Sequence, residues 1–245
     1  MMGRAPAWLA VALSCAASTA LACAPERVEP VAGLRADRPL TLAAPDGRRI
    51  RLVALAGEAA VPAAAVARIA ILGPADRHER LPVLALGASG PIEAEMLRDG
   101  AARLTLTRLV PRDCWRLLEA AETEAVSARR GIWATSRSVL LDTNDAEALT
   151  AAEGRFVVAT GRVRSVRTVN RITYINFGAP RAGALTVTIH ERDMPAFREF
   201  GLEPAAIRGH MLRVRGVVTI RRGPFIAAAM PEAVTIAEAP ARGAR

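Results

Sequence analysis

The sequence predicts a mainly β fold with some α-helix, arranged as two barrel-type domains in series. Short segments that alternate apolar and polar residues, bounded by turn residues, recur in both halves of the chain and are typical of strands. Few stretches have helical periodicity, and the clearest is 113–130. The 245 residues, 51% hydrophobic and 23% charged, suffice for two small globular domains and a tail.

Residues 1–22 have the features of a secretory signal peptide. Arg4 gives a positive start, 7–17 is apolar, and Ala20-Leu21-Ala22 is an A-x-A cleavage site. The apolar run is too short to span a bilayer. We therefore expect an exported protein, in the periplasm or cell envelope, with no transmembrane segment in the mature chain.

Cleavage after this segment would leave Cys23 as the first residue. A lipid anchor on Cys23 is therefore an alternative to plain export. The preceding Ala-Leu-Ala differs from the usual lipoprotein sequence and favours plain export. The mature chain would hold only Cys23 and Cys114, so we expect no disulfide framework. We expect Cys114 to be a small packed side chain rather than a nucleophile.

The first half of the chain predicts strands followed by helices. We expect strands at 31–42, 49–55, 81–86 and 101–109, and helices at 91–100 and 113–130. Asp46-Gly47 marks a hairpin turn before the central strand, 49–55. Alternation places Ile50 and Leu52 on one face of that strand and Arg49 and Arg51 on the other.

The stretch 46–60, DGRRIRLVALAGEAA, resembles the strand D-G-x-x-I-R-L-x-x-I-D-A-P-E of the thermonuclease (staphylococcal-nuclease-like) family. Residues 76–80 resemble its D-R-Y-G-R stretch, and 91–100 and 121–133 resemble two of its helices. The resemblance covers about 31–135. It implies that 28–138 is a nuclease-like OB barrel with C-terminal helices.

The resemblance also implies site residues. It puts Arg51 and Arg80 at the family's phosphate-binding positions and Glu58, after a one-residue deletion, at its catalytic glutamate. The two calcium-binding aspartates would fall on Arg38 and Ala56. We therefore expect Arg51, Glu58 and Arg80 to be vestigial and expect no metal site.

An active enzyme is the alternative for this domain. It would hold calcium, or another hard cation, in a shifted site of Asp37, Glu58 and Asp76.

The second half predicts an OB barrel over 153–237, after a polar linker at 139–152 and before a flexible tail at 238–245. Three strand patterns, a short helix and two more strands follow one another in the order of that fold. Four strands are expected at 155–169, with a bend at Gly161, and at 172–177, 184–190 and 211–220. A last strand is expected after the turn at Arg222-Gly223-Pro224 and ends at Ile236, and the helix is expected at 194–200. The motifs GRVRSV, YINFG and LRVRG resemble bacterial nucleic-acid-binding OB domains.

Positive charge is concentrated in this second half. Residues 23–150 hold 17 Arg and 17 acidic residues, whereas 151–245 hold 15 Arg and 7 acidic residues, a net charge of +8. Arginines that share strand faces or flank a turn, with one aromatic platform, indicate a groove for single-stranded nucleic acid. The candidates are Arg162, Arg164, Arg167, Arg171, Tyr174, Arg213 and Arg215. The alternative is a solvated face whose arginine stems cover apolar surface.

These patterns predict an exported, degenerate thermonuclease-like protein that binds nucleic acid or another polyanion without cutting it, and that needs no cofactor. The small number of aromatic residues predicts weak or unspecific binding. Two alternatives stay open at this point: a metal-dependent nuclease that uses calcium, and a structural envelope protein whose OB domain contacts another protein.

Overall fold

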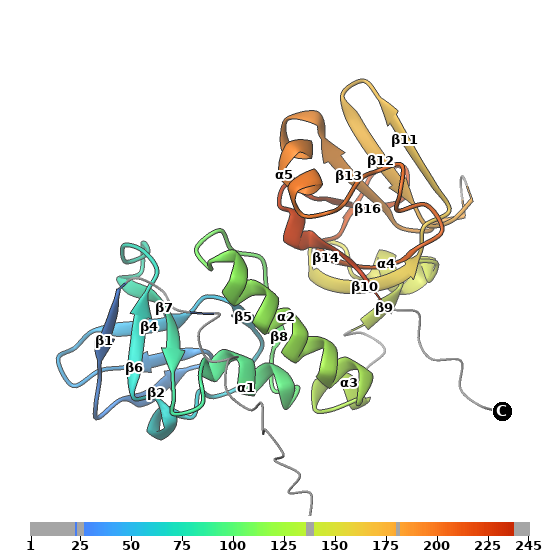
Figure 1. Cartoon of the computed structure of the whole chain (residues 1–245). Coiled ribbons are helices and arrows are strands. Elements are labelled where there is room, and N and C mark those ends of the chain that lie inside the picture. Colours follow the sequence, from blue (N-terminus) through green and yellow to red (C-terminus); the bar gives the residue numbers. More distant parts are fainter. Residues whose placement is uncertain (1–22, 24–26, 136–139, 180–181, 238–245) are drawn as a thin grey trace, which may run out of the picture.

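The computed structural model is mainly β with a few helices, in two domains that each have a hydrophobic core (Figure 1). The predicted signal peptide, 1–22, and the predicted tail, 238–245, lie outside the described residues. The described residues are 23, 27–135, 140–179 and 182–237. Within them, no helix is both long and apolar enough to cross a bilayer.

The first domain contains a six-stranded sheet in the order β1-β6-β7-β4-β3-β2, with β4 and β7 parallel. The strands are β1 (Val28–Pro30), β2 (Arg35–Arg38), β3 (Thr41–Ala43), β4 (Arg49–Leu52), β6 (Arg68–Ile71) and β7 (Arg80–Leu86), with β5 (Leu55–Ala56) and β8 (Arg103–Leu104) as a separate pair. The predicted alternation on β4 is confirmed, because Ile50 and Leu52 are buried and Arg49 and Arg51 are half-buried.

Two predicted strands of this domain were too long. The segment 31–42 is divided into β2 and β3 by a turn at Pro39-Leu40. Pro39 has no N–H for a ladder, and Leu40 has a φ of 56° with its side chain buried in the core. Of 101–109, only β8 is a strand.

The helices of the first domain are α1 (Ile92–Arg98), α2 (Arg112–Ser127) and α3 (Ile132–Thr135), with a 3-10 turn at Ala63–Ala65. The two predicted helices, 91–100 and 113–130, correspond to α1 and α2 and pack on each other. Their following loops meet at two glycines. A Cβ atom on Gly100 would lie 2.3 Å from the carbonyl oxygen of Arg130, so this approach requires glycine.

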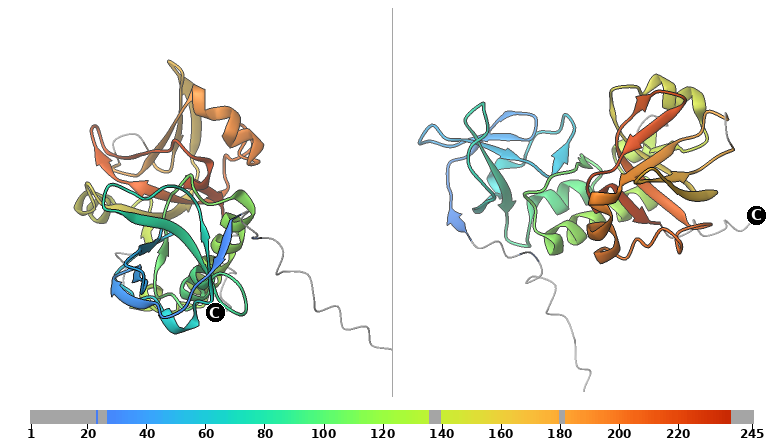
Figure 2. Two further views of the ribbon diagram at one scale, coloured as in Figure 1. Left: turned by 90° about the vertical axis from the view of Figure 1, so that its left-hand side faces the viewer. Right: turned by 90° about the horizontal axis from the view of Figure 1, so that it is seen from above.

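The second domain contains a four-stranded sheet, β17-β14-β10-β9, and a five-stranded sheet, β11-β12-β13-β16-β15. The strands are β9 (Leu140–Asp142), β10 (Phe156–Arg162), β11 (Ser165–Val169), β12 (Ile172–Asn176), β13 (Thr186–His190), β14 (Met211–Val217), β15 (Thr219–Ile220), β16 (Pro224–Ala227) and β17 (Val234–Ile236). The helices are α4 (Ala146–Ala151) and α5 (Met194–Glu199), with 3-10 turns at Glu191–Asp193 and Pro231–Ala233. The right-hand view of Figure 2 shows the two domains side by side.

The prediction of a linker at 139–152 was wrong for residues 140–152, which the structure describes. β9 pairs in parallel with β10, and Leu141 and Leu149 are buried in the core of the second domain. The polar residues that suggested a linker instead form a helix start, where the Asp145 carboxylate accepts a hydrogen bond of 3.0 Å from the Ala148 N–H. The second domain therefore begins by Leu140.

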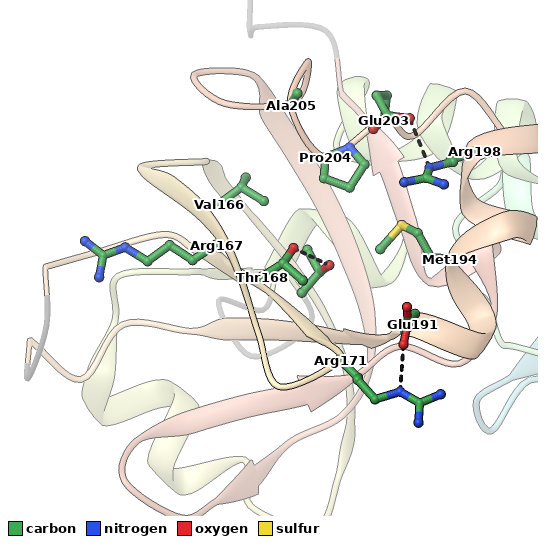
Figure 3. A pocket seen from close by; sticks show the side chains of 11 residues that line it. Val166, Arg167, Thr168, Arg171, Glu191, Met194, Arg198, Glu203, Pro204 and Ala205 are labelled. Carbon is green, nitrogen blue, oxygen red and sulfur yellow. Dashed lines mark hydrogen bonds and ion pairs between the residues drawn. The ribbon is translucent and has the colours of Figure 1, made fainter.

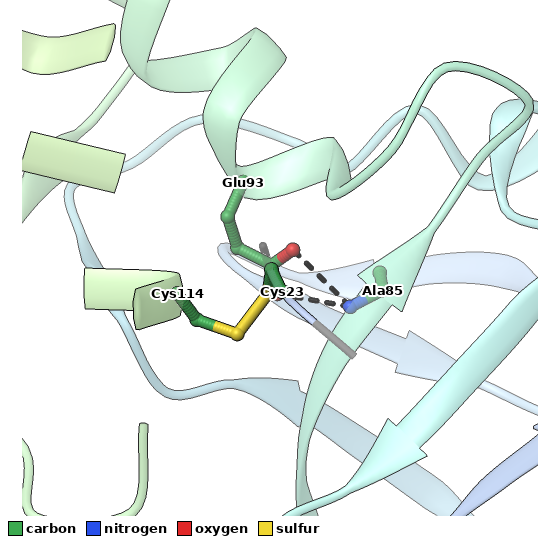
Figure 4. The surroundings of a disulfide bond; sticks show 4 residues. All are labelled: Cys23, Ala85, Glu93 and Cys114. Carbon is green, nitrogen blue, oxygen red and sulfur yellow. Dashed lines mark hydrogen bonds between the residues drawn. A yellow bond between two sulfur atoms is a disulfide. The ribbon is translucent and has the colours of Figure 1, made fainter. Parts of the chain in front are cut away.

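A disulfide joins Cys23 to Cys114 on α2, across 91 residues of sequence (Figure 4). The expectation of no disulfide framework did not include this single bond. It rested on the number of cysteines, whereas their pairing depends on the fold, which brings the two Cα atoms to 4.5 Å. A Cys23 sulfur held in this bond is not available for a lipid anchor.

Glu93, in the surroundings of the disulfide in Figure 4, is a fully buried carboxyl group on α1. Burial raises its pKa to about 8, although the Ala85 N–H of β7 donates to its two oxygens at 3.0 and 3.2 Å and opposes the shift. The side chain is therefore largely protonated at neutral pH.

Reduction of the disulfide should destabilise the protein by about 2–4 kcal/mol, because the bond restricts the unfolded chain. The measurement is urea unfolding of the mature chain with and without a thiol reductant. The double variant Cys23→Ser/Cys114→Ser should match the reduced wild type and should not respond to reductant. A midpoint that reductant leaves unchanged in the wild type would contradict the prediction.

The stability of the wild type should fall as pH rises from about 5 to 8. Over this range Glu93 is ionised in the unfolded chain, whereas the folded side chain keeps its proton. The free energy of unfolding should therefore fall by roughly 1 kcal/mol for each pH unit. The free energy of unfolding of Glu93→Gln, measured with urea at each pH, should not show this fall. Glu95→Gln, on the same helix and half-buried, is the matched control and should keep the wild-type slope.

Candidate nucleic-acid interface

Arg51 and Arg80 lie on neighbouring strands, as the thermonuclease resemblance implies. β4 and β7 pair in parallel, with Arg51 opposite Pro82 and Arg49 opposite Arg80. The pKa of Arg51 is lowered by burial and then by the positive charge of Arg80. The two guanidinium groups are thus close enough to interact electrostatically.

The carboxylates near them are held by arginines. Asp76 accepts hydrogen bonds from Arg80 Nε at 2.9 Å and Nη2 at 2.7 Å, which hold the pKa of Asp76 well below its usual range. Asp37 forms an ion pair of 3.2 Å with Arg49 on β4. Glu58 is exposed in the turn after β5. The three acids of the shifted site are therefore not gathered around a common centre.

A calcium ion does not fit this arrangement. It needs roughly six to eight oxygen ligands, largely from carboxylates. Among residues 27–135, 140–179 and 182–237, no group of three or more His, Cys, Asp and Glu side chains could hold a metal ion. The acids predicted for the shifted site instead serve ion pairs or face solvent.

Arg213 and Arg215 do not belong to a nucleic-acid groove, which corrects the sequence analysis. Arg215 has 0% exposure, and its Nη1 lies 2.8 Å from Glu122 Oε2 on α2 of the first domain. Arg213 Nη1 donates to Thr123 Oγ1 at 2.7 Å. The prediction that the two arginines share a face of β14 agrees with these contacts, but that face is covered by α2.

Glu122 is the interface residue that sequence reasoning missed. Sequence analysis did not select it as a site residue, yet it is fully buried. Its Oε1 also accepts a hydrogen bond of 2.7 Å from the Leu104 N–H. The signal was available, because Glu122 stands four residues after Leu118 and three before Ala125, both on the buried stripe of α2.

Arg164, Arg167 and Tyr174 do come together, in an open groove of about 1020 Å³ over the five-stranded sheet. The same groove is lined by four residues that the sequence analysis did not select as binding residues: Arg208, Arg221, Arg222 and Phe225. Two of these arginines lie in the turn between β15 and β16, which sequence reasoning treated only as a turn. We call this hollow the arginine groove.

The lining of the arginine groove contains five arginines and no Asp or Glu. Within the part of the chain that the structure describes, none of the five forms an ion pair with a carboxylate. Tyr174 and Phe225 are half-buried, so their rings line the groove beside these cations. The guanidinium carbon of Arg221 lies 5.2 Å from the centre of the Phe225 ring, so the groove offers unneutralised positive charge together with the aromatic surface of Tyr174.

Arg162 and Arg171 lie outside the arginine groove. Arg162 Nη1 donates to the Gly209 carbonyl oxygen at 2.6 Å. Arg171 lines a second hollow, of about 490 Å³, where it pairs with Glu191 at 2.7 Å (Figure 3). In the same hollow Arg198 pairs with Glu203 at 3.2 Å. These two pairs make the second hollow much less positive than the arginine groove.

Removal of Glu122 should destabilise the chain by about 3–5 kcal/mol, because Arg215 would stay buried without its partner. Urea unfolding of Glu122→Ala measures this cost. Glu122→Leu combined with Arg215→Met should recover most of it, since apolar replacement of both partners leaves no buried charge. Glu124→Ala, on the same helix but in exposed pairs with Arg98 and Arg130, is the control and should leave the unfolding midpoint nearly unchanged.

Comparison with known proteins adds little to this geometry. The chain matches no protein-family model, and no curated protein matches it. One solved structure with some likeness is "OBody AM1L10 bound to hen egg-white lysozyme", at 21% sequence identity over 36% of this chain and 85% of that chain. Its TM-score of 0.28 is too low to bear on the fold or function of this protein.

Proposed function

We propose that the protein is exported and binds nucleic acid or another polyanion in the arginine groove of its second domain. The observation that carries the proposal is the lining of that groove, with five arginines and no carboxylate among the described residues. Each neutralised phosphate releases counterions, and this gives arginine-rich grooves most of their affinity for nucleic acid. The ring of Tyr174 adds a surface on which a base could stack.

We propose an OB-type barrel for the second domain. β10 and β11 act as the two halves of one bent strand, which pairs with β14 through β10 and with β12 through β11. β12 pairs with β13, which pairs in parallel with β16. This order of pairing supports the OB assignment, and OB domains bind oligonucleotides on the sheet face that corresponds to the arginine groove.

The first domain, in this proposal, is a thermonuclease-like OB domain that no longer cuts phosphodiesters. Its motifs at 46–60, 76–80, 91–100 and 121–133 support the family assignment. The ion pairs of Asp37 and Asp76 with arginines support the loss of the metal site. Arg51 stands on the same face as Arg80 but forms no ion pair among the described residues, so Arg51 is the part of the site that could still contact a phosphate.

Export is supported by two features of the chain. The first 22 residues read as a signal peptide. The bond between Cys23 and Cys114 is of a kind that forms and persists in oxidising compartments such as the periplasm. The use of the Cys23 sulfur in that bond favours a free exported protein over a lipid-anchored one.

Binding should be strongly salt-dependent and should depend on the groove. For single-stranded DNA we expect a slope of roughly −2 to −3.5 in log K against log salt, from about three to five phosphate contacts at −0.7 each. The variant Arg164→Ala/Arg221→Ala/Arg222→Ala should reduce the magnitude of this slope by about 2. Fluorescence anisotropy of the mature chain with a labelled oligonucleotide measures the slope.

Arg171→Ala/Arg198→Ala is the matched control, since both side chains are already paired with glutamates in the second hollow. It should leave the slope nearly unchanged. The oligonucleotide should also stay intact when calcium, magnesium or manganese is added. Cleavage that a chelator abolishes would favour the nuclease alternative, and an absence of salt-dependent binding would favour a protein-contacting role.

A further inference from the structure

A short ladder of polar side chains crosses the floor of the arginine groove. Asn176 Nδ2 on β12 donates to Ser165 Oγ on β11 at 3.2 Å. Thr186 Oγ1 on β13 donates to Asn176 Oδ1, also at 3.2 Å. These three residues stand opposite one another in the strand register, and all three line the groove.

Both aromatic residues of the groove stand beside the ladder in the strand register. Tyr174 is two residues before Asn176 on β12, so both side chains are on the same face. Phe225 on β16 stands opposite Thr186, and the guanidinium carbon of Arg221 lies 5.2 Å from the centre of its ring. From the spacing of strands and residues, the backbone positions of Tyr174 and Phe225 are about 12 Å apart across the sheet.

The two hydrogen bonds hold the amide of Asn176 and leave part of it free. An amide has two N–H donors and two acceptor lone pairs, and the ladder uses one of each. Serine and threonine Oγ atoms lie one bond nearer the backbone than the amide atoms of asparagine, so they approach the amide from its inner side. Among the described residues, one N–H and one lone pair of this amide therefore have no hydrogen-bond partner.

We propose that Asn176 recognises a base of a single-stranded nucleic acid through this free amide edge, while Tyr174, two residues away on the same face of β12, provides a stacking surface. A donor and an acceptor side by side match the edge of a base, as in the bidentate pairing of asparagine with adenine. Unpaired bases expose such edges, whereas a base-paired strand does not present them all.

This inference rests on the proposed function and goes further, because it makes the groove selective among bases. Phosphate contacts by the arginines carry no sequence information. A sulfated polysaccharide or polyphosphate would satisfy the arginines equally well but has no base for Asn176. The amide thus separates nucleic acid from other polyanions of the same charge.

The test compares the mature chain with four labelled homopolymers, oligo-dA, oligo-dC, oligo-dG and oligo-dT of 12 nucleotides, and with heparin as competitor. The wild type should discriminate between its best and worst homopolymer by about fivefold or more, which is the discrimination of one good bidentate contact. Asn176→Ala should reduce that spread to about twofold or less and leave the salt slope unchanged. Ser165→Ala/Thr186→Val, which retains Asn176 but removes the ladder, should give an intermediate spread.

Unchanged thermal unfolding of each variant establishes that the fold is kept, and Arg171→Ala serves as the surface control. Equal affinity of the wild type for all four homopolymers, with salt-dependent binding, would overturn the role of Asn176 and leave the proposed function standing. The role of Asn176 is also overturned if the spread survives in Asn176→Ala, or if heparin displaces every oligonucleotide equally from wild type and variant. Failure to bind any polyanion would overturn the proposed function itself.

Discussion

The arrangement of this protein depends on one buried ion pair, between Arg215 of the second domain and Glu122 of the first. Arg215 also lies with its guanidinium carbon 5.6 Å from the centre of the Trp115 ring, and its Nη1 donates to the Leu104 carbonyl oxygen at 3.3 Å. Two charges taken out of water cost several kcal/mol each unless they are matched by geometry and extra hydrogen bonds. Such a pair tolerates little displacement, so it fixes α2 against β14.

Other contacts follow from this docking and extend it along the same side of the first domain. Thr235 of β17 donates to Glu119, one turn before Glu122 on α2. Arg112, at the start of α2, donates to the Glu199 carbonyl oxygen at 2.8 Å and lies over the Phe200 ring. The first domain thereby acts as a support for the second, whatever remains of the chemistry its strand motifs suggest.

The arginines of the chain fall into three groups according to what lies beside them. Arg213 and Arg215 are buried and hold the domains together. Arg49, Arg80 and Arg171 are neutralised by carboxylates at the surface, where such pairs contribute little stability. The arginines of the groove have no carboxylate in its lining and keep their charge for a ligand. Arginine is therefore a buried structural residue, a surface ion-pair partner or a binding residue in this protein, and the neighbouring side chains determine which of these roles it has.

The sequence by itself determined the local features of this protein. Strand patterns identified β4, β7, β12 and β13, with Ile50 and Leu52 as inward residues of β4, and helical periodicity identified α1 and α2, because these signals depend on the side chains of one segment. The charge count placed the positive excess in the second half, where the groove is. These predictions needed no knowledge of which segments meet.

Only the tertiary structure decided what covers each face. Alternation placed Arg213 beside Arg215, but the helix that buries them begins about 100 residues earlier in the chain. The pairing of Cys23 with Cys114, the entry of β9 into the second sheet and the gathering of Arg208 with Arg221 are also contacts between distant segments. A pattern within a segment states which side chains share a face, whereas their burial, partners and charge depend on the segment packed against it.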